Sequence, residues 1–235
     1  MKTAFFQIWW EVEFFSGCAN LSKACAAEGF HILAYDILYG PGNDLLTVLE
    51  WAFKFLWTHR IALVWLGAPC TSWSRARKLG GGPPPVRDDH DVLFGLPPHL
   101  SAHDRHKVTL GNQLLEVTLK IISFCNQLGI RWVLENPWTS RLWLAPSVQL
   151  LADAHLLKTD YCQFKQPWRK ATGLLRSRFD ELNSAVKVCN ANNNRCSATG
   201  RPHIILQGKD EHGVFFTFRA QPYPTALCEQ IALLL

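Results

Sequence analysis

The sequence has no apolar run long enough to cross a lipid bilayer, and no internal repeat is apparent. Its first residues include Lys2 and several aromatics, but Glu11 and Glu13 interrupt them early and no small-residue cleavage site follows. We therefore expect the N-terminal stretch to lead into a buried strand and not to act as a signal peptide. We also expect no membrane partner.

Charged residues are few, at 18% of the 235 residues, whereas 48% are hydrophobic. This composition is typical of a globular domain that can bury its own core, and we expect a monomer. The eight cysteines stand mostly in apolar stretches. They predict reduced, packed thiols and an intracellular location, nuclear in a eukaryote or cytoplasmic in a prokaryote or virus.

Hydrophobic runs and helical periodicity alternate along the first part of the chain. Strands are predicted at 11–15, 30–35, 61–66 and 131–134, and helices at 21–28, 43–59 and 107–127. This alternation predicts an α/β fold with a Rossmann-like, doubly wound, mostly parallel sheet that binds ligands at the carboxyl ends of its strands. Further along, short strands are predicted at 155–161, 203–207 and 213–218, before a last helix at 224–235.

Three predicted strands end in residues that carry chemistry. Gly17 follows the first strand and would let a ligand approach the backbone, and Asp36 closes the second strand where nucleotide-binding sheets hold a ribose. Cys70 follows the strand 61–66 in a Gly-Pro turn, near arginines that would favour its thiolate. Glu135 follows a hydrophobic strand, so it must be paired or protonated near neutral pH, as a general acid requires.

Each acid and the cysteine also have a plain structural interpretation. Asp36 could be a turn residue, and Asp44 could cap the helix that follows it instead of meeting an adenine amino group. Cys70 could be a packed cysteine, and Glu135 could be a carboxylate satisfied by backbone or arginine groups. Their order at successive strand ends favours the chemical interpretation.

Five motifs occur in the order found in cytosine-C5 DNA methyltransferases. They are FFSGCANLS, GAPCTSWS, LENP, QFKQPWRK and the terminal QPYPTALCEQIALLL. The chain resembles a compact, divergent member of this family from about residue 11 onward. The resemblance implies a transferase that uses S-adenosylmethionine as its cofactor, binds DNA and flips the target base out of the stack. RNA stays open as the substrate.

The resemblance also implies roles for individual residues. In this chemistry Cys70 adds to C6 of cytosine and makes C5 nucleophilic, while Glu135, organised by Asn136, acts at N3. The implied catalytic residues are Cys70, Glu135, Asn136 and Arg169. The implied cofactor-binding residues are Phe15, Ser16, Gly17, Asp36, Asp44 and Pro69.

The chain departs from the family pattern in its cofactor loop, where Ala19 and Asn20 stand in place of two glycines and Glu13 in place of an aspartate. The resemblance divides the chain into a catalytic domain (1–173), a small, mostly β target-recognition insert (174–220) and a C-terminal helix that returns to the catalytic domain (221–235). Because the insert is short, we expect little sequence specificity.

Two basic stretches, 75–107 and 165–178, contribute to a net charge of +5. They predict phosphate contacts on both sides of a groove, although either could be a solvated face. The implied nucleic-acid-binding residues are Ser74, Arg75, Arg77, Arg87 and Lys170. The Gly- and Pro-rich loop 75–106 follows the nucleophile, and we expect it to be mobile and to close over a flipped base.

Cys189, Cys196 and His203 could ligate zinc, with Cys162 or His212 as the fourth ligand. Their spacings are wider than those of common zinc motifs. The sequence therefore favours packed cysteines over a metal site, and we expect no metal.

Three other functions stay open. An N6-adenine or N4-cytosine methyltransferase would carry an Asn-Pro-Pro-aromatic signature, whereas Asn136-Pro137-Trp138 has one proline and follows Glu135. A binding module of methyltransferase fold would keep nucleic-acid affinity without turnover. The altered cofactor loop favours such a module, while Cys70 and Glu135 oppose it. An α/β protein with chance motifs is disfavoured by the motif order.

Overall fold

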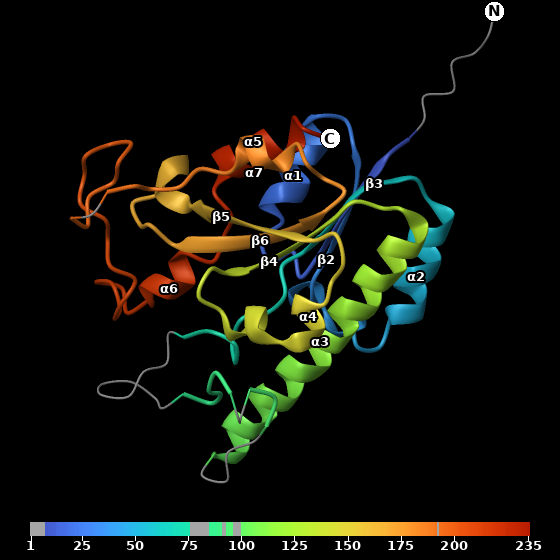
Figure 1. Cartoon of the computed structure of the whole chain (residues 1–235), viewed down its shortest axis with the longest axis horizontal. Coiled ribbons are helices and arrows are strands. Elements are labelled where there is room, and N and C mark those ends of the chain that lie inside the picture. The colour runs from blue at the N-terminus through green and yellow to red at the C-terminus, as the bar shows by residue number, and fades with distance from the viewer. Residues whose placement is uncertain (1–7, 76–84, 91–92, 96–99, 192) are drawn as a thin grey trace, which may run out of the picture.

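The computed structural model describes residues 8–75, 85–90, 93–95, 100–191 and 193–235 (Figure 1). Six strands form one mixed sheet in the order β2-β1-β3-β4-β6-β5. The parallel strands are β1 (Trp10–Phe14), β2 (His31–Tyr35), β3 (Ile61–Leu66) and β4 (Trp132–Pro137). β6 (Ala171–Ser177) runs antiparallel to both of its neighbours, β4 and β5 (His155–Asp160).

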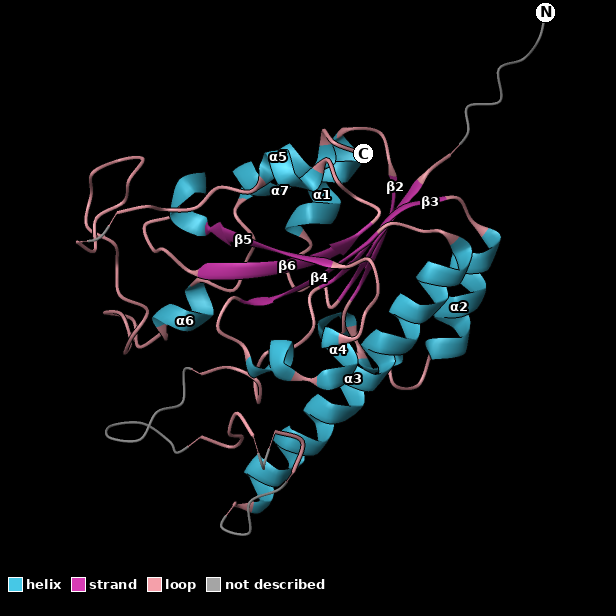
Figure 2. Cartoon of the chain, in the orientation of Figure 1, coloured by secondary structure: helices cyan, strands magenta, loops and turns pink. Residues whose placement is uncertain are grey.

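Helices cover both faces of this sheet (Figure 2). One face carries α2 (Leu49–Thr58), α3 (Ala102–Leu128) and α4 (Pro146–Gln149). The other face carries α1 (Asn20–Ala27), α5 (Leu182–Ala185) and α7 (Thr225–Ala232). The short helix α6 (Phe216–Arg219) lies in the connection before α7. The predicted doubly wound, mostly parallel α/β architecture is confirmed.

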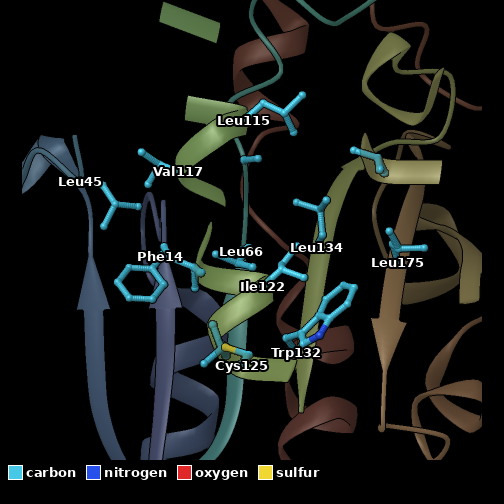
Figure 3. Close-up of a cluster of buried hydrophobic side chains, with 14 of the residues drawn as sticks. Phe14, Leu45, Leu66, Leu115, Val117, Ile122, Cys125, Trp132, Leu134 and Leu175 are labelled. Carbon is cyan, nitrogen blue, oxygen red and sulfur yellow. The ribbon is translucent and has the colours of Figure 1, made fainter. Parts of the chain in front are cut away.

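The alternation of side chains along each strand sends them into two cores. Phe14, Leu66 and Leu134 enter the core under α2 and α3, where Trp132 and Ile122 also pack (Figure 3). Leu63, Trp65 and Val133 enter the core under α1 and α7. All six residues of β3 are buried, which explains its continuous apolar run IALVWL.

Two predicted helix starts are wrong for local reasons. α2 begins at Leu49 and not at 43, because Pro41–Asn43 forms a 3₁₀ turn and the carboxylate of Asp44 accepts the N–H of Leu46. α3 begins at Ala102 and not at 107, because the hydroxyl of Ser101 accepts the N–H of Asp104 and caps the helix.

The prediction of a mostly β insert is also wrong. Between 178 and 220 the described residues form α5, α6 and two isolated bridges, and neither 203–207 nor 213–218 is a strand. Phe215 and Phe218 are exposed, so their apolar pattern packs on no sheet. The real strand nearby is β6, which belongs to the main sheet and crosses the predicted boundary at residue 173.

β6 was not predicted because its sequence, ATGLLRS, contains a glycine that weakens a strand pattern. A Cβ on Gly173 would lie 2.9 Å from the indole ring of Trp143. The glycine therefore permits a close packing contact that only the folded chain reveals. Among the described residues, no helix combines the length and apolarity needed to span a membrane.

Candidate active site

The carboxyl ends of β1, β2, β3 and β4 lie along one edge of the sheet, because these strands are parallel. The antiparallel β6 begins at the same edge, so Lys170, which precedes it, arrives there too. A cavity of about 460 Å³ opens at this edge, and we call it the large cavity. Its walls include Ser16, Gly17, Cys70, Glu135, Lys170 and Tyr223.

The turn between β1 and α1 has a left-handed backbone at Phe15, Gly17 and Ala19, with φ of 59°, 54° and 54°. The N–H of Gly17 donates to Asp36 Oδ2 at 2.8 Å, which ties this turn to the end of β2. Ala19 adopts a conformation that favours glycine. The turn thus keeps its shape without the glycine, at the cost of local strain.

A small cavity of about 160 Å³ adjoins the large cavity, since Pro69 lines both. Asp36 and Asp44 bring carboxylates to it. Asp36 also accepts the N–H groups of Gly17 and Leu38, and Asp44 accepts that of Leu46. Both acids therefore accept hydrogen bonds that stabilise local turns, and both also line the small cavity. The apolar walls come from Phe15, Leu45, Pro69, Leu110 and Leu114.

Cys70 lies in the turn after β3, half-buried in the wall of the large cavity. Burial raises the pKa of its thiol, the charge of Glu135 raises it further, and the ammonium of Lys170 lowers it. The expected arginine assistance is not seen in the described residues. Arg75 instead pairs with Asp89 at 2.7 Å and donates to the carbonyl of Thr139. Among the described residues, the cation that favours the thiolate is Lys170.

Glu135 lies near the end of β4 with 7% of its surface exposed. Burial raises the pKa of its carboxyl, against the opposing effects of Lys170 and of the Tyr223 hydroxyl. The Tyr223 hydroxyl donates to Glu135 Oε2 at 3.3 Å, and Oε1 has no partner within the described part of the chain. A buried carboxyl with one free oxygen can hold a proton and present it to a ligand.

Asn136 is fully buried beside Glu135. Its Nδ2 donates to the carbonyl of Ala68 at 2.7 Å. Ala68 lies in the turn that leads from β3 to Cys70, so this bond fixes the turn against β4. Asn136 therefore acts on the site by positioning the backbone that carries Cys70.

Sequence reasoning did not single out Tyr223. It comes from the segment before α7, and Asn20 Nδ2 donates to its carbonyl at 2.8 Å. A Cβ on Gly67 would lie 2.5 Å from the Tyr223 hydroxyl oxygen, so only glycine leaves room for this ring at the end of β3. The one available signal was a tyrosine between two prolines in a motif already assigned to the cofactor side.

Arg169, implied to be catalytic, does not line the large cavity in this structure. Its Nε lies 3.3 Å from Asp160 Oδ2, and its Nη2 donates to the carbonyl of Cys189 at 2.8 Å. The next residue, Lys170, faces the cavity instead. In the motif QFKQPWRK, the residue that lines the cavity is therefore Lys170 and not Arg169.

The residues implied to bind nucleic acid have different environments. Arg87 is 2% exposed, with its guanidinium 3.5 Å from the ring centre of Trp73, so it has no access to a phosphate in this structure. Arg75 and Ser74 are partly exposed beside the Cys70 turn. Arg77 and much of the loop expected to close over a base lie outside the described residues.

A second group of reactive side chains lies beyond β5, outside the cavity walls. Cys162, Cys189, Cys196 and His203 are all buried, and their ligand atoms lie within 4.8 Å of one another. His212, the other candidate for a fourth ligand, is exposed and lies beside Glu211. Of the two candidates for a fourth ligand, the structure thus brings Cys162 and not His212 to Cys189, Cys196 and His203.

The sequence matches no protein-family model and no curated protein.

Proposed function

We propose that the protein transfers a methyl group from S-adenosylmethionine to C5 of cytosine in DNA. The observation that carries this proposal is the joint presence of Cys70 and Glu135, a thiol and a partly unpartnered buried carboxyl, in one cavity. Addition to C6 of cytosine requires a thiolate, and the charge that then builds on the ring requires an acid at N3.

The small cavity fits the adenosyl part of the methyl donor. Its apolar walls suit a purine ring, and its two carboxylates can accept hydrogen bonds from hydroxyl and amino groups. Asp36 and Asp44 would hold the ribose and the adenine. S-adenosylmethionine, when bound, supplies an electrophilic methyl group on a sulfonium ion.

Cys70 forms the covalent bond to the substrate. Its thiolate adds to C6, the electrons of the C5–C6 double bond move into the ring, and N3 takes the proton that Glu135 holds. C5 is then nucleophilic enough to accept a methyl group. Loss of the C5 proton to water re-forms the C5–C6 double bond as the bond between Cys70 and C6 breaks, and N3 returns its proton to Glu135.

The protonation state of Glu135 affects how readily the Cys70 thiol ionises. An ionised Glu135 raises the pKa of the Cys70 thiol, so a protonated Glu135 removes this repulsion. Lys170 then stabilises the thiolate. Burial of Glu135 therefore serves both the acid and the nucleophile, while Asn136 holds their two strand ends together.

A trapping experiment tests the proposal. The purified protein is incubated with labelled S-adenosylmethionine and duplex DNA containing 5-fluorocytosine, then run on a denaturing gel. Fluorine at C5 blocks the final proton loss, so we expect a shifted, labelled band. C70A should abolish the band, and E135Q should reduce it at least about 100-fold, the usual size of a general-acid contribution.

C125A is the matched control, because Cys125 is a buried cysteine of α3 that lines neither cavity. It should keep the adduct. An adduct with fluorinated RNA but not with DNA would identify RNA, and not DNA, as the substrate. Methyl transfer that survives C70A would indicate amino-group methylation. Cofactor binding without any adduct would indicate a non-catalytic binding module.

A further inference from the structure

The segment from 186 to 219 has little that could hold it in place by packing. It contains α6 and two isolated bridges. Its buried residues, among those the structure describes, are Cys189, Cys196 and His203. Its large apolar side chains Ile205, Phe215 and Phe218 are exposed. A segment of this kind needs a cross-link or a metal to define one conformation.

The three buried residues meet Cys162, which follows β5 in the 3₁₀ turn Tyr161–Phe164. Cys189 Sγ lies 3.8 Å from His203 Nε2. Tetrahedral zinc, with its usual bond lengths, holds a sulfur and a nitrogen ligand about 3.6 Å apart and two sulfur ligands about 3.8 Å apart. The four ligand atoms, all within 4.8 Å, are thus close to the spacing that one ion would impose.

The local backbone supports these positions. The N–H of Ser197 points at Cys189 Sγ at 3.3 Å, and Gln163 Nε2 lies 3.6 Å from the sulfurs of both Cys162 and Cys196. Donors directed at sulfur stabilise thiolates, which are the metal-binding form. Cys196 also opens a tight turn, in which the N–H of Gly200 donates to the Cys196 carbonyl at 2.7 Å.

We propose that Cys162, Cys189, Cys196 and His203 bind one structural Zn²⁺ ion. Three thiolates and one imidazole complete a tetrahedral set with no position left for water or substrate, so the ion stabilises the fold and takes no part in catalysis. This site does not depend on the proposed methyl transfer.

Hydrogen bonds and one ion pair would connect the metal-binding segment to the wall of the large cavity. Asp160 Oδ2 accepts the N–H of Cys189 and pairs with Arg169, and Arg169 donates to the carbonyl of Cys189. The N–H of Ile204 donates to the carbonyl of Pro167. The zinc segment is therefore attached to the loop that brings Lys170 to the large cavity.

The first test is the metal content of the 235-residue protein, purified without added metal and without chelator. We expect about one zinc ion per chain, as measured by inductively coupled plasma mass spectrometry. After replacement by Co²⁺, the absorption spectrum should show the intense sulfur-to-cobalt charge transfer of three thiolates and the d–d bands of a tetrahedral site. This readout requires no variant and no enzymatic activity.

Variants then assign the ligands. H203A and C196S should lose the zinc, or retain it at least about tenfold more weakly against a chromogenic chelator. H212A is the matched control, because His212 lies in the same segment and is exposed. It should keep one zinc. If H203A and C196S are insoluble, cobalt titration of the wild-type protein still counts the thiolates.

Three results would overturn the proposal. One is a folded wild-type protein that contains no zinc and takes up none after reconstitution. Another is a disulfide among Cys162, Cys189 and Cys196, seen as two missing free thiols in the denatured, chelator-treated chain. The last is a cobalt spectrum without thiolate charge transfer.

Discussion

At the scale of single residues, β1 carries two buried acids that the site does not use. Glu11 and Glu13 face α1, and the hydroxyl of Ser22 lies 3.0 Å and 2.7 Å from their Oε2 atoms. Burial raises the pKa of Glu13 to about 7, although the Ser22 hydroxyl and N–H oppose the shift, and raises that of Glu11 as well. The folded protein therefore holds protons here that a solvated glutamate would release.

The free energy of unfolding should consequently fall as the pH rises from about 4.5 to about 7. In this window the unfolded chain has released the Glu13 proton and the folded chain keeps it, so stability decreases by up to about 1.4 kcal/mol per pH unit for one group. The E13Q variant has no such proton, and its profile should be flatter. Urea unfolding at a series of pH values measures the free energy of unfolding of the wild-type protein and of E13Q. If it depends on pH equally in the two proteins, Glu13 does not hold the proton.

At the scale of elements, Arg87 joins the Cys70 turn to α3. Its guanidinium stacks on Trp73 and donates to the hydroxyl of Ser72 and to the carbonyls of Leu93 and Val108. The packing is close, since a Cβ on Gly111 of α3 would lie 3.0 Å from Arg87 Nη2. The residue thus holds the loop after β3 on the helix that follows it.

R87M should destabilise the protein by about 3 kcal/mol, because it leaves buried carbonyl and hydroxyl groups without a donor. R75M removes an ion pair that is more than a third exposed, so its effect on stability should stay below about 1 kcal/mol. Chemical denaturation of both variants makes the comparison. A small loss for R87M would mean that Arg87 is free to serve a ligand instead.

At the scale of the whole molecule, the first and last helices of the described residues, α1 and α7, pack together. α7 packs on α1 through Ile231 and Leu227, which share a core with Leu21. The segment that leads into α7 supplies Tyr223 to Glu135. The segment before α7 therefore lines the same cavity as Ser16 and Gly17, which follow the first strand.

I231A should lower the free energy of unfolding by about 2–4 kcal/mol, the usual range for removing a buried branched side chain. L233A, two residues on, changes a side chain that is 70% exposed and should cost less than about 0.5 kcal/mol. Thermal or urea unfolding distinguishes them. Equal stability of the two variants would show that α7 is not packed on α1.

The sequence alone predicted the features that repeat along the chain. Alternating strands and helices, with β3 wholly apolar, determined a doubly wound α/β sheet, and the topology then placed Asp36, Cys70 and Glu135 at one edge. Such periodic patterns are local, because the spacing of apolar residues within one strand or helix shows which of its faces is buried. The order of residues at the strand ends needed no knowledge of side-chain contacts.

Only the tertiary structure decided which side chains reach the cavities and which donor atoms meet. Arg169 turns to Asp160 while Lys170 faces the site, Arg87 is buried, and Tyr223 arrives from the far end of the chain. Cys162 meets Cys189, Cys196 and His203, which lie 27 or more residues further along. These outcomes depend on contacts between segments distant in sequence, which no local pattern records.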